Sequence, residues 1–357
     1  LLASFYNLFK SFAFKMDAEA AHISSIKLLS SFPLVLSEVF GGQKLPKNDR
    51  YKLTVGGQDW SFPIGLAAGL DKNAEAIDFF SSLYFGAVEV GTITPESQIG
   101  NPRPRLFRYP KECSLRNQMG FNNDGAEKIY ENIKDAKKNC KILGINLGKN
   151  KATSQEKAFL DYQILYKKFA KIADYLVLNL SSPNTPGLRD FQQSERLSEL
   201  LSSLKDLRKE IPVPLYLKIS PDLSELDLPG IIDVVKEHNL TGLIGTNTTI
   251  VESLGAGGVS GKLLRPKSQK IRNKVLEYIK ETPNIELIGV GGVSEFSDLI
   301  NFWQNGGKVM QLYTSFIFKG PNVLLDIQRD IERHLVLNQV NTLNQFISNI
   351  DEMKIIL

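Results

Sequence analysis

The sequence is poor in cysteine and histidine. Cys113 and Cys140 are its two cysteines, no Cys-x-x-Cys pair occurs, and there are three histidines. Two separated thiols exclude a disulfide framework, a four-cysteine zinc site and a cysteine-ligated iron–sulfur cluster within the chain. We therefore predict no metal site, and a reducing compartment fits this cysteine usage.

Long apolar runs, repeats and low-complexity tracts are also missing. No apolar run reaches the roughly 18 residues that a membrane-spanning helix needs. The chain starts at Leu1 and its first methionine is Met16, so an upstream anchor or targeting segment is compatible with it. The net charge of +4 is small and the basic residues are dispersed, so nucleic acid is not an expected partner.

Eight short apolar runs alternate with amphipathic segments along most of the chain. The runs lie near Ile64, Ala87, Ile142, Tyr175, Leu215, Leu243, Leu287 and Val309. This alternation is typical of parallel strands linked by helices. We predict an α/β fold, a (β/α)8 TIM barrel, with a short β-hairpin around Gly56-Gly57 at the barrel floor.

The first residues follow a different pattern. Leu2, Phe5, Leu8, Phe9 and Phe12 repeat at helical spacing. Asp17 is suited to cap a second helix carrying His22, and Pro33 with Gly41-Gly42 is expected to close the segment. We predict a two-helix module at 1–42 and a barrel domain at 43–357. Two roles fit the module: a cover packed on the barrel, or an interfacial hairpin that dips into a membrane surface and admits a lipophilic substrate.

Polar motifs follow the predicted strands. They are Ala67–Lys72, Glu89–Thr92, Asn146–Asn150, Asn179–Arg189, Leu217–Ser220, Gly245–Thr249, Gly289–Gly292 and Gln311–Ser315. In a parallel barrel these strand ends share one face, which is where barrel enzymes place their active sites. The long segments 93–122 and 250–265 are expected to act as lids or walls of that face.

Four of these motifs suggest binding chemistry. Gly289-Val-Gly-Gly292 and Tyr313-Thr314-Ser315, at the ends of the seventh and eighth strands, suit a phosphate held by backbone N–H groups, and Gly257–Gly261 is a candidate third wall. Lys218 lies on an apolar strand, where a lysine without an acidic neighbour requires an anion. Lys72 with several asparagines suits a carboxylate attached to a ring of alternating N–H and C=O groups.

The segment Asn179-Leu-Ser-Ser-Pro-Asn-Thr-Pro-Gly-Leu-Arg189 resembles the active-site loop of the class 2 (quinone-dependent, membrane-associated) dihydroorotate dehydrogenases. The resemblance continues through motifs in the same order from His22 to Pro321. It implies an FMN-dependent enzyme that oxidises dihydroorotate to orotate in pyrimidine biosynthesis. The electrons would pass to a membrane quinone, ubiquinone or menaquinone.

Two alternatives are weighed against this assignment. A cytosolic-class dihydroorotate dehydrogenase would use fumarate or a nicotinamide-linked partner, but that class carries cysteine where this chain has Ser182. A non-catalytic flavin- or phosphate-binding barrel that serves as a membrane adaptor would not need the complete set of Lys72, Asn117, Ser182 and Asn184. Both are therefore disfavoured.

The resemblance assigns roles to individual residues. Ser182 is the base that takes the C5 proton of dihydroorotate while the C6 hydride moves to FMN. The expected substrate-binding residues are Lys72, Asn117, Met119, Gly120, Phe121, Asn179, Asn184, Asn247 and Thr248. The expected FMN-binding residues are Ala68, Gly69, Thr92, Asn146, Asn179, Lys218, Thr246, Gly261, Gly291, Gly292, Tyr313 and Thr314. His22 and Arg105 are expected along the quinone tunnel.

Several further expectations complete the hypothesis. Because no histidine lies in the eight motifs, Thr185 with water is the candidate proton relay for Ser182. Gln118 departs from the charged residue often found there in the family, and residues 337–357 match no family segment. We expect peripheral association with the cytoplasmic face of a bacterial inner membrane, with the mitochondrial inner membrane as the alternative, and no protein partner for catalysis.

Overall fold

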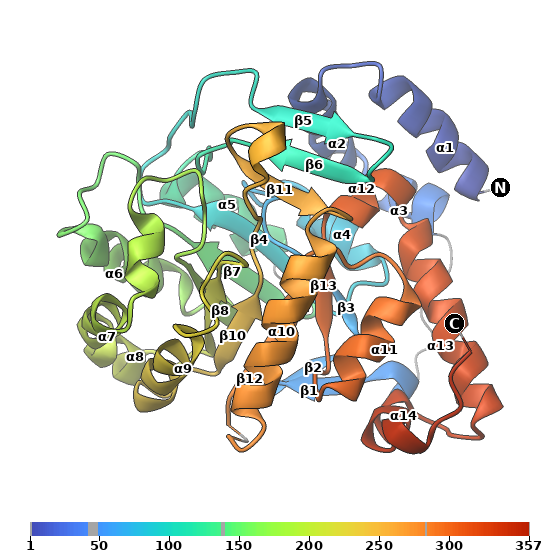
Figure 1. Cartoon of the computed structure of the whole chain (residues 1–357). Coiled ribbons are helices and arrows are strands. Elements are labelled where there is room, and N and C mark those ends of the chain that lie inside the picture. Colours follow the sequence, from blue (N-terminus) through green and yellow to red (C-terminus); the bar gives the residue numbers. More distant parts are fainter. Residues whose placement is uncertain (1, 42–48, 137–139, 283, 357) are drawn as a thin grey trace.

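The computed structural model describes residues 2–41, 49–136, 140–282 and 284–356 (Figure 1). Its centre is a closed barrel of eight parallel strands in the spatial order β10-β12-β13-β3-β4-β7-β8-β9. The strands are β3 (Ile64–Leu66), β4 (Val88–Ile93), β7 (Leu143–Leu147), β8 (Tyr175–Asn179), β9 (Leu215–Ile219), β10 (Gly242–Gly245), β12 (Glu286–Val290) and β13 (Met310–Leu312). Each lies where the sequence predicts a strand, so the TIM-barrel prediction is confirmed.

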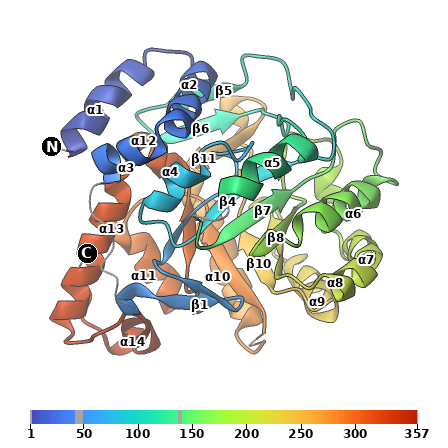
Figure 2. The ribbon, with the colours of Figure 1, turned by 180° about the vertical axis from the view of Figure 1, so that it is seen from behind.

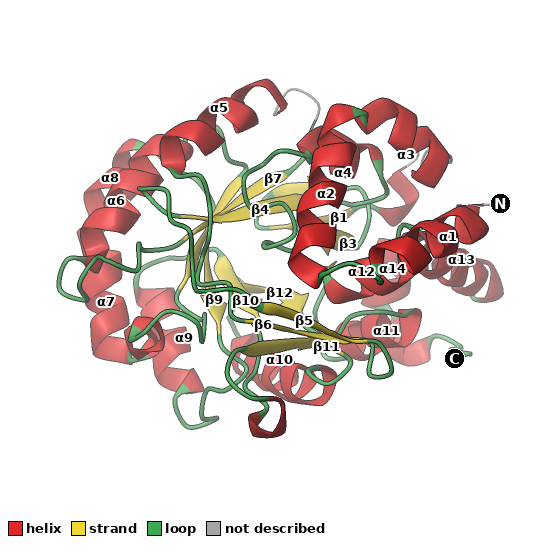
Figure 3. Cartoon of the chain, turned by 90° about the horizontal axis from the view of Figure 1, so that it is seen from above, coloured by secondary structure: helices red, strands yellow, loops and turns green. Residues whose placement is uncertain are grey.

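Helices surround the barrel, as the view from above shows (Figure 3). They are α4 (Ile77–Ser82), α5 (Ala126–Ala136), α6 (Ala158–Phe169), α7 (Ser194–Ser203), α8 (Lys205–Glu210), α9 (Leu228–Glu237), α10 (Arg265–Ile279), α11 (Phe296–Gln304), α12 (Thr314–Lys319) and α13 (Asn322–Leu337). Every residue of β4, β7, β8 and β9 is buried. Helices cover their outer side and side chains fill the interior, which explains why these strands read as continuous apolar runs.

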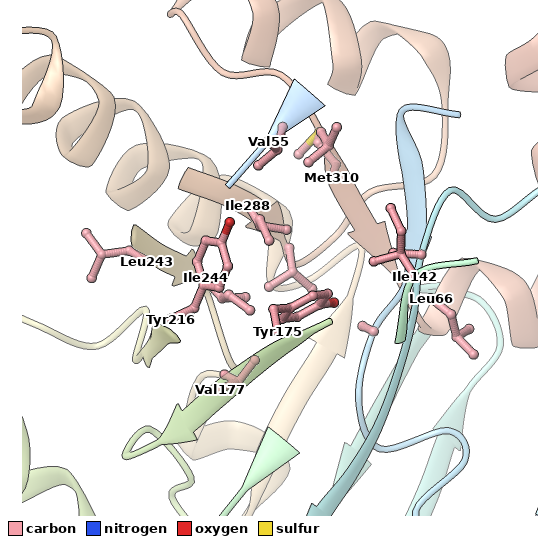
Figure 4. Packing of buried hydrophobic residues seen from close by; sticks show 14 of the residues in the cluster. Val55, Leu66, Ile142, Tyr175, Val177, Tyr216, Leu243, Ile244, Ile288 and Met310 are labelled. Atoms are coloured by element: carbon pink, nitrogen blue, oxygen red, sulfur yellow. The ribbon is translucent and has the colours of Figure 1, made fainter. Parts of the chain in front are cut away.

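The predicted hairpin closes one end of the barrel. Strands β1 (Leu53–Val55) and β2 (Gln58–Trp60) pair antiparallel, and the Gly56 backbone N–H donates to the carboxylate of Glu286, the first residue of β12. Figure 4 shows side chains of the interior cluster, including the ring of Tyr216. That ring lies 5.6 Å from the ring of Tyr175, centroid to centroid. Because Glu286, which contacts the hairpin, begins β12, the hairpin lies at the amino ends of the strands, opposite the polar motifs.

The two long segments on the opposite face form a small antiparallel sheet. It consists of β5 (Leu106–Tyr109), β6 (Ser114–Asn117) and β11 (Gly258–Gly261), in the order β11-β6-β5. The sequence predicts these segments as lids or walls and gives no indication that they pair. Pairing joins the loop after β4 to the loop after β10 into one wall above the barrel (Figure 1).

The N-terminal residues form three helices, α1 (Leu2–Ala13), α2 (Ala18–Ser31) and α3 (Pro33–Gly41). The predicted cap is confirmed, because the Asp17 carboxylate accepts from the Glu19 and Ala20 backbone N–H groups. The two-helix prediction is wrong: Pro33 begins a third helix, and the first helical turn is where proline is tolerated. The predicted boundary between 1–42 and 43–357 lies outside the described residues.

These helices lie at the end of the barrel that carries β5 and β6, as the view from behind shows (Figure 2). In α1, Tyr6 Oη donates to the Ile317 carbonyl at 2.7 Å and Lys10 Nζ donates to the Phe318 carbonyl at 3.0 Å, both on α12. Among the described residues no single helix has the length and apolar composition to cross a bilayer. Residues 18–40 meet that test only as a pair of helices bent by 106°.

The last described residues lie beside α11 and α13. Helix α14 (Leu343–Ser348) begins with a capping box in which Thr342 and Gln345 bond reciprocally. His334 of α13 is buried and its ring lies 4.4 Å from the ring of Phe296 on α11. Its Nε2 accepts from the Ile356 backbone N–H at 3.2 Å. The unmatched tail therefore packs on the barrel's outer helices.

Candidate active site

A cavity of about 700 Å³ opens at the carboxyl ends of the strands, within the 300–1,000 Å³ range usual for cofactor and substrate sites. Polar motifs from strands far apart in sequence meet there, as the barrel prediction requires. The predicted residues that line it are His22, Ala68, Gly69, Lys72, Thr92, Asn117, Met119, Gly120, Phe121, Asn179, Ser182, Asn184, Lys218, Thr246, Asn247, Thr248, Gly261, Gly291, Gly292, Tyr313 and Thr314. Asn146, Arg105 and Thr185 lie outside this lining.

The serine loop leaves the end of β8 and is held by side chains from neighbouring loops. Ser182 is 5% exposed, and its Oγ accepts from the Asn184 backbone N–H at 3.2 Å. Arg189 donates to the carbonyls of Ser181 and Thr248, each at 3.0 Å, and to Asp222 at 2.8 Å. Arg189 thus fixes the loop against the loops after β9 and β10, a role that the sequence does not reveal.

The predicted proton relay is not supported by this arrangement. Thr185 is 5% exposed but does not line the cavity with Ser182. The relay role of Thr185 therefore stays a prediction.

Asparagines and one lysine form a second part of the lining. Asn184 Nδ2 donates to Asn117 Oδ1 at 3.1 Å, so these carboxamides lie side by side although β6 and the serine loop are distant in sequence. Lys72 Nζ donates to Asn122 Oδ1 at 2.8 Å. Burial, with a smaller contribution from the charge of Arg105, lowers the pKa of Lys72 to about 7. A bound anion would stabilise the ammonium form.

Lys218 does have an acidic neighbour, contrary to the premise of the sequence argument. Its Nζ lies 3.7 Å from Glu89 Oε1, with Lys218 5% and Glu89 0% exposed. Glu89 lies on β4, so nothing near Lys218 in the sequence indicates this pairing. Asn146 lies below the lining and donates from Nδ2 to the same Glu89 oxygen at 2.9 Å. Its predicted role in cofactor binding stays a prediction.

The far end of the cavity is built on Gly291 and Gly292, whose φ angles of 106° and 76° favour glycine. Arg272 Nη1 donates to the Gly291 carbonyl at 2.8 Å, and Arg265 Nε donates to the Gly292 carbonyl at 3.1 Å. Lys262 and Arg265 also line this end and were missed by sequence reasoning. Their position within four residues after Gly261 was the available signal.

Two buried polar atoms at the cavity lack a partner among the described residues. They are Ser315 Oγ and Gln311 Oε1, and both residues line the cavity. Unpaired buried polar atoms are rare because each costs about 1–3 kcal/mol. Both atoms are therefore free to hydrogen-bond to a molecule held in the cavity.

A second cavity of about 120 Å³ lies between the N-terminal helices and the barrel. Its walls are mainly apolar, and it shares Lys10, Phe14, His22, Leu106 and Tyr313 with the large cavity. Burial, followed by the charge of Lys72, lowers the pKa of His22 to about 4. The imidazole is therefore neutral near pH 7 and fits a largely apolar passage.

Arg105 lines neither cavity. Its Nη2 lies 2.7 Å from Glu19 Oε1 of α2, and its Nη1 donates to the carbonyls of Ile99 and Asn101 at 2.5 and 2.7 Å. Burial alone would raise the pKa of Glu19, but Arg105 and then Arg103 lower it below its usual value. Arg105 therefore joins the N-terminal helices to the loop after β4.

Comparison with known proteins places this geometry in context. The family model described as dihydroorotate dehydrogenase matches residues 50–335. A Vibrio parahaemolyticus protein named dihydroorotate dehydrogenase (quinone) is 41% identical over 340 residues, covering 91% of this chain and 99% of that protein. An Idiomarina loihiensis protein of the same name is 40% identical over 343 residues, covering 92% of this chain and 100% of that protein.

Solved structures agree. The crystal structure of a ligand-free type DHODH from Eimeria tenella superposes with a TM-score of 0.83 at 32% identity, covering 95% of this chain and 100% of that one. The DHODH from the same organism in complex with ferulenol gives a TM-score of 0.78 at 32% identity, covering 92% of this chain and 95% of that one.

Proposed function

The chain belongs to the dihydroorotate dehydrogenase family, and from this we propose how its residues carry out the family's reaction. The enzyme oxidises dihydroorotate to orotate in pyrimidine biosynthesis, with a quinone as electron acceptor. The shared cavity carries the proposal, because it collects Ser182, Lys72, Lys218 and the asparagines at one rim. A membrane adaptor has no dehydrogenase activity, and a cytosolic-class enzyme does not use a quinone. Neither alternative therefore matches the name dihydroorotate dehydrogenase (quinone) that these relatives carry.

FMN is the cofactor that we assign to the cavity. The glycine-rich end, with Gly291, Gly292 and the unpaired Ser315 Oγ, fits a phosphate, and the unpaired Gln311 Oε1 fits a hydrogen-bond donor on a ring. Ala68, Gly69, Thr92, Asn179, Lys218, Thr246, Gly261, Tyr313 and Thr314 would complete the binding surface. When bound, FMN would supply an acceptor for the hydride and a carrier for electrons.

Substrate recognition is assigned to the lysine and carboxamides of the opposite wall. Lys72 would bind the dihydroorotate carboxylate, and the shift of its pKa to about 7 means that the anion and the proton on Lys72 stabilise each other. Asn117, Asn184 and Asn247 would bond the ring N–H and C=O groups. The backbone and side chains of Met119, Gly120, Phe121 and Thr248 would enclose the ring.

Ser182 is the group that we assign to proton removal at C5. Its Oγ accepts from the Asn184 N–H, which holds the hydroxyl oxygen toward the cavity. A serine accepts a proton only as it loses its own. Since Thr185 does not line the cavity, water in the open part of the site would take that proton.

The quinone passage is assigned to the second cavity and to neutral His22. We also propose peripheral membrane association at the cytoplasmic face of a bacterial inner membrane, with the mitochondrial inner membrane as the alternative. Large apolar side chains are exposed on all three N-terminal helices, among them Leu8, Phe12, Leu28, Leu34 and Val35. Exposed apolar side chains of this kind are typical of interfacial helices.

One anaerobic titration tests the assignment. The purified protein should be yellow, should bleach on addition of dihydroorotate, and should regain its colour when a soluble quinone analogue is added. A protein that retains no flavin after gentle preparation, or whose flavin is not reduced by dihydroorotate, would contradict it. Flotation with lipid vesicles tests the membrane proposal, and a Leu34→Asp variant should float less than wild type.

A further inference from the structure

We infer that Glu89 is a positioning residue that fixes which way the buried carboxamides beneath the cavity point, and hence which of their atoms face a bound molecule. The inference rests on the proposed function, since it concerns the same cavity. The carboxylate is fully buried on β4. It is surrounded by side chains from β7, β8, β9 and β13.

Both carboxylate oxygens accept hydrogen bonds. Glu89 Oε1 accepts from Asn146 Nδ2 at 2.9 Å and lies 3.7 Å from Lys218 Nζ. Glu89 Oε2 accepts from Gln311 Nε2 at 2.7 Å and from Tyr175 Oη at 3.2 Å. An ionised carboxylate can only accept. Each carboxamide beside it must therefore turn its NH2 group toward Glu89 and its oxygen away.

The first consequence concerns the asparagines. With Nδ2 directed at Glu89, Asn146 Oδ1 accepts from Thr92 Oγ1 at 2.6 Å and from Asn179 Nδ2 at 3.0 Å. Asn179 Oδ1 then accepts from Ser181 Oγ at 2.9 Å and from Asn247 Nδ2 at 3.3 Å. From Glu89 to the serine loop and the loop after β10, every donor in this chain of side chains therefore faces an acceptor.

The second consequence concerns Gln311. Its Nε2 is used by Glu89 and by Tyr175 Oη, the latter at 3.1 Å. Its Oε1 is buried without a partner among the described residues, and Gln311 lines the cavity. The charge on Glu89 therefore presents a carbonyl oxygen, rather than an NH2 group, to the N–H or O–H of a bound cofactor.

A glutamine at position 89 cannot reproduce this pattern. It has one oxygen and one NH2 group, whereas the wild-type site needs an acceptor on both sides. Either Asn146 or Gln311 must then reverse. If Asn146 reverses, its NH2 group faces the NH2 group of Asn179. If Gln311 reverses, its NH2 group replaces its oxygen at the cavity, so the cavity loses an acceptor and gains a donor. Lys218 also loses its nearest carboxylate.

The experiment compares FMN release from the purified holoenzymes of wild type, Glu89→Gln and Tyr175→Phe, measured by flavin fluorescence on dilution. Glu89→Gln should bind FMN about tenfold to a hundredfold more weakly, the effect of one mispaired buried polar group. Tyr175→Phe removes a hydrogen bond from the same carboxylate and one from Gln311 Nε2, but keeps the charge of Glu89 and its contacts with Asn146 and Gln311. It should lower the melting temperature while FMN affinity changes by less than about threefold.

The outcomes separate this inference from the proposed function. Equal FMN affinity of wild type and Glu89→Gln, or an equal loss in Glu89→Gln and Tyr175→Phe, would overturn the inference and leave the function standing. A wild type without FMN would overturn the function. If Glu89→Gln does not fold, neutron diffraction of the wild-type enzyme decides. Deuterium on the Asn146 and Gln311 atoms facing Glu89 supports the inference, and its absence there refutes it.

Discussion

Ser182 and Lys218 line the same cavity, although one lies on the loop after β8 and the other on β9. The parallel register pairs Asn179 of β8 with Lys218 of β9. The residues that follow Asn179 therefore leave the sheet at the level of the lysine. Strand pairing, rather than any direct contact between Ser182 and Lys218, brings the proposed base and the cationic group to one site.

Ser182→Ala should slow the reduction of bound flavin by dihydroorotate by about 10²- to 10⁴-fold, the usual contribution of a positioned proton acceptor. Orotate affinity should change little, because the binding contacts come from Lys72 and the asparagines. Anaerobic stopped-flow reduction and orotate titration measure the two effects. Ser182→Cys, which keeps an ionisable group, should retain more activity than Ser182→Ala. Unchanged reduction in Ser182→Ala would remove Ser182 from its role.

Ala21→Phe should block the small cavity between the N-terminal helices and the barrel. Ala21 is buried on α2 and lines that cavity of about 120 Å³, which cannot hold a phenyl ring and a quinone together. Turnover with a hydrophobic quinone should fall at least about tenfold, while flavin reduction by dihydroorotate is unaffected. Ala20→Phe, at the exposed neighbouring position, is the matched control. Equal quinone turnover in the two variants would show that the quinone enters elsewhere.

Glu19→Gln should loosen the N-terminal helices. The substitution leaves the guanidinium of Arg105, which is 3% exposed, without its carboxylate. Removing one partner of a buried ion pair costs about 3–5 kcal/mol. We expect a lower melting temperature and faster proteolytic cleavage within residues 2–41. Glu38→Gln, on the exposed side of α3, should have neither effect. If both variants are cleaved alike, the Glu19–Arg105 pair does not hold the module in place.

His22 should make the stability of the enzyme depend on pH. Burial lowers its pKa to about 4 from 6.5, so between these values the unfolded chain binds a proton that the folded protein excludes. Its contribution is complete above about pH 6.5 and is lost as the pH falls toward 4. Relative to His22→Gln, wild type should lose about 2 kcal/mol of unfolding free energy between pH 7 and pH 4.5. Urea denaturation at both pH values measures this, and parallel curves would show that His22 titrates normally.

Much of the fold could be predicted from local sequence patterns. The eight strands lie where apolar runs occur, because a strand buried on both faces must be apolar along its length. The Asp17 cap and the floor hairpin follow from residue preferences that act over a few positions. The third helix was missed because proline starts a helix as readily as it ends one, and the local sequence around Pro33 does not distinguish the two.

The sequence predicts most of the residues that line the cavity, but it does not predict the strand pairing, ion pairs and hydrogen bonds between them. The serine loop, the glycine-rich end and Lys72 are short motifs that carry their chemistry in adjacent residues. The pairing of β5, β6 and β11 was not foreseen, nor were the partners of Lys218 and Arg105. Each of those contacts joins segments that are far apart in the sequence. Local sequence patterns do not show which of these segments will meet.

The sequence by itself determined the barrel and the rim on which its polar motifs gather, because strand periodicity and strand order fix which ends share a face, and the family resemblance supplied the other residues expected there. The tertiary structure alone decided that Glu89 lies against Lys218, Asn146 and Gln311, that Glu19 pairs with Arg105, and that Thr185 is not among the residues that line the cavity. The physical reason is that a buried charge is stabilised by whichever groups the closed barrel places within a few ångströms of it, and that neighbourhood exists only once the chain has folded.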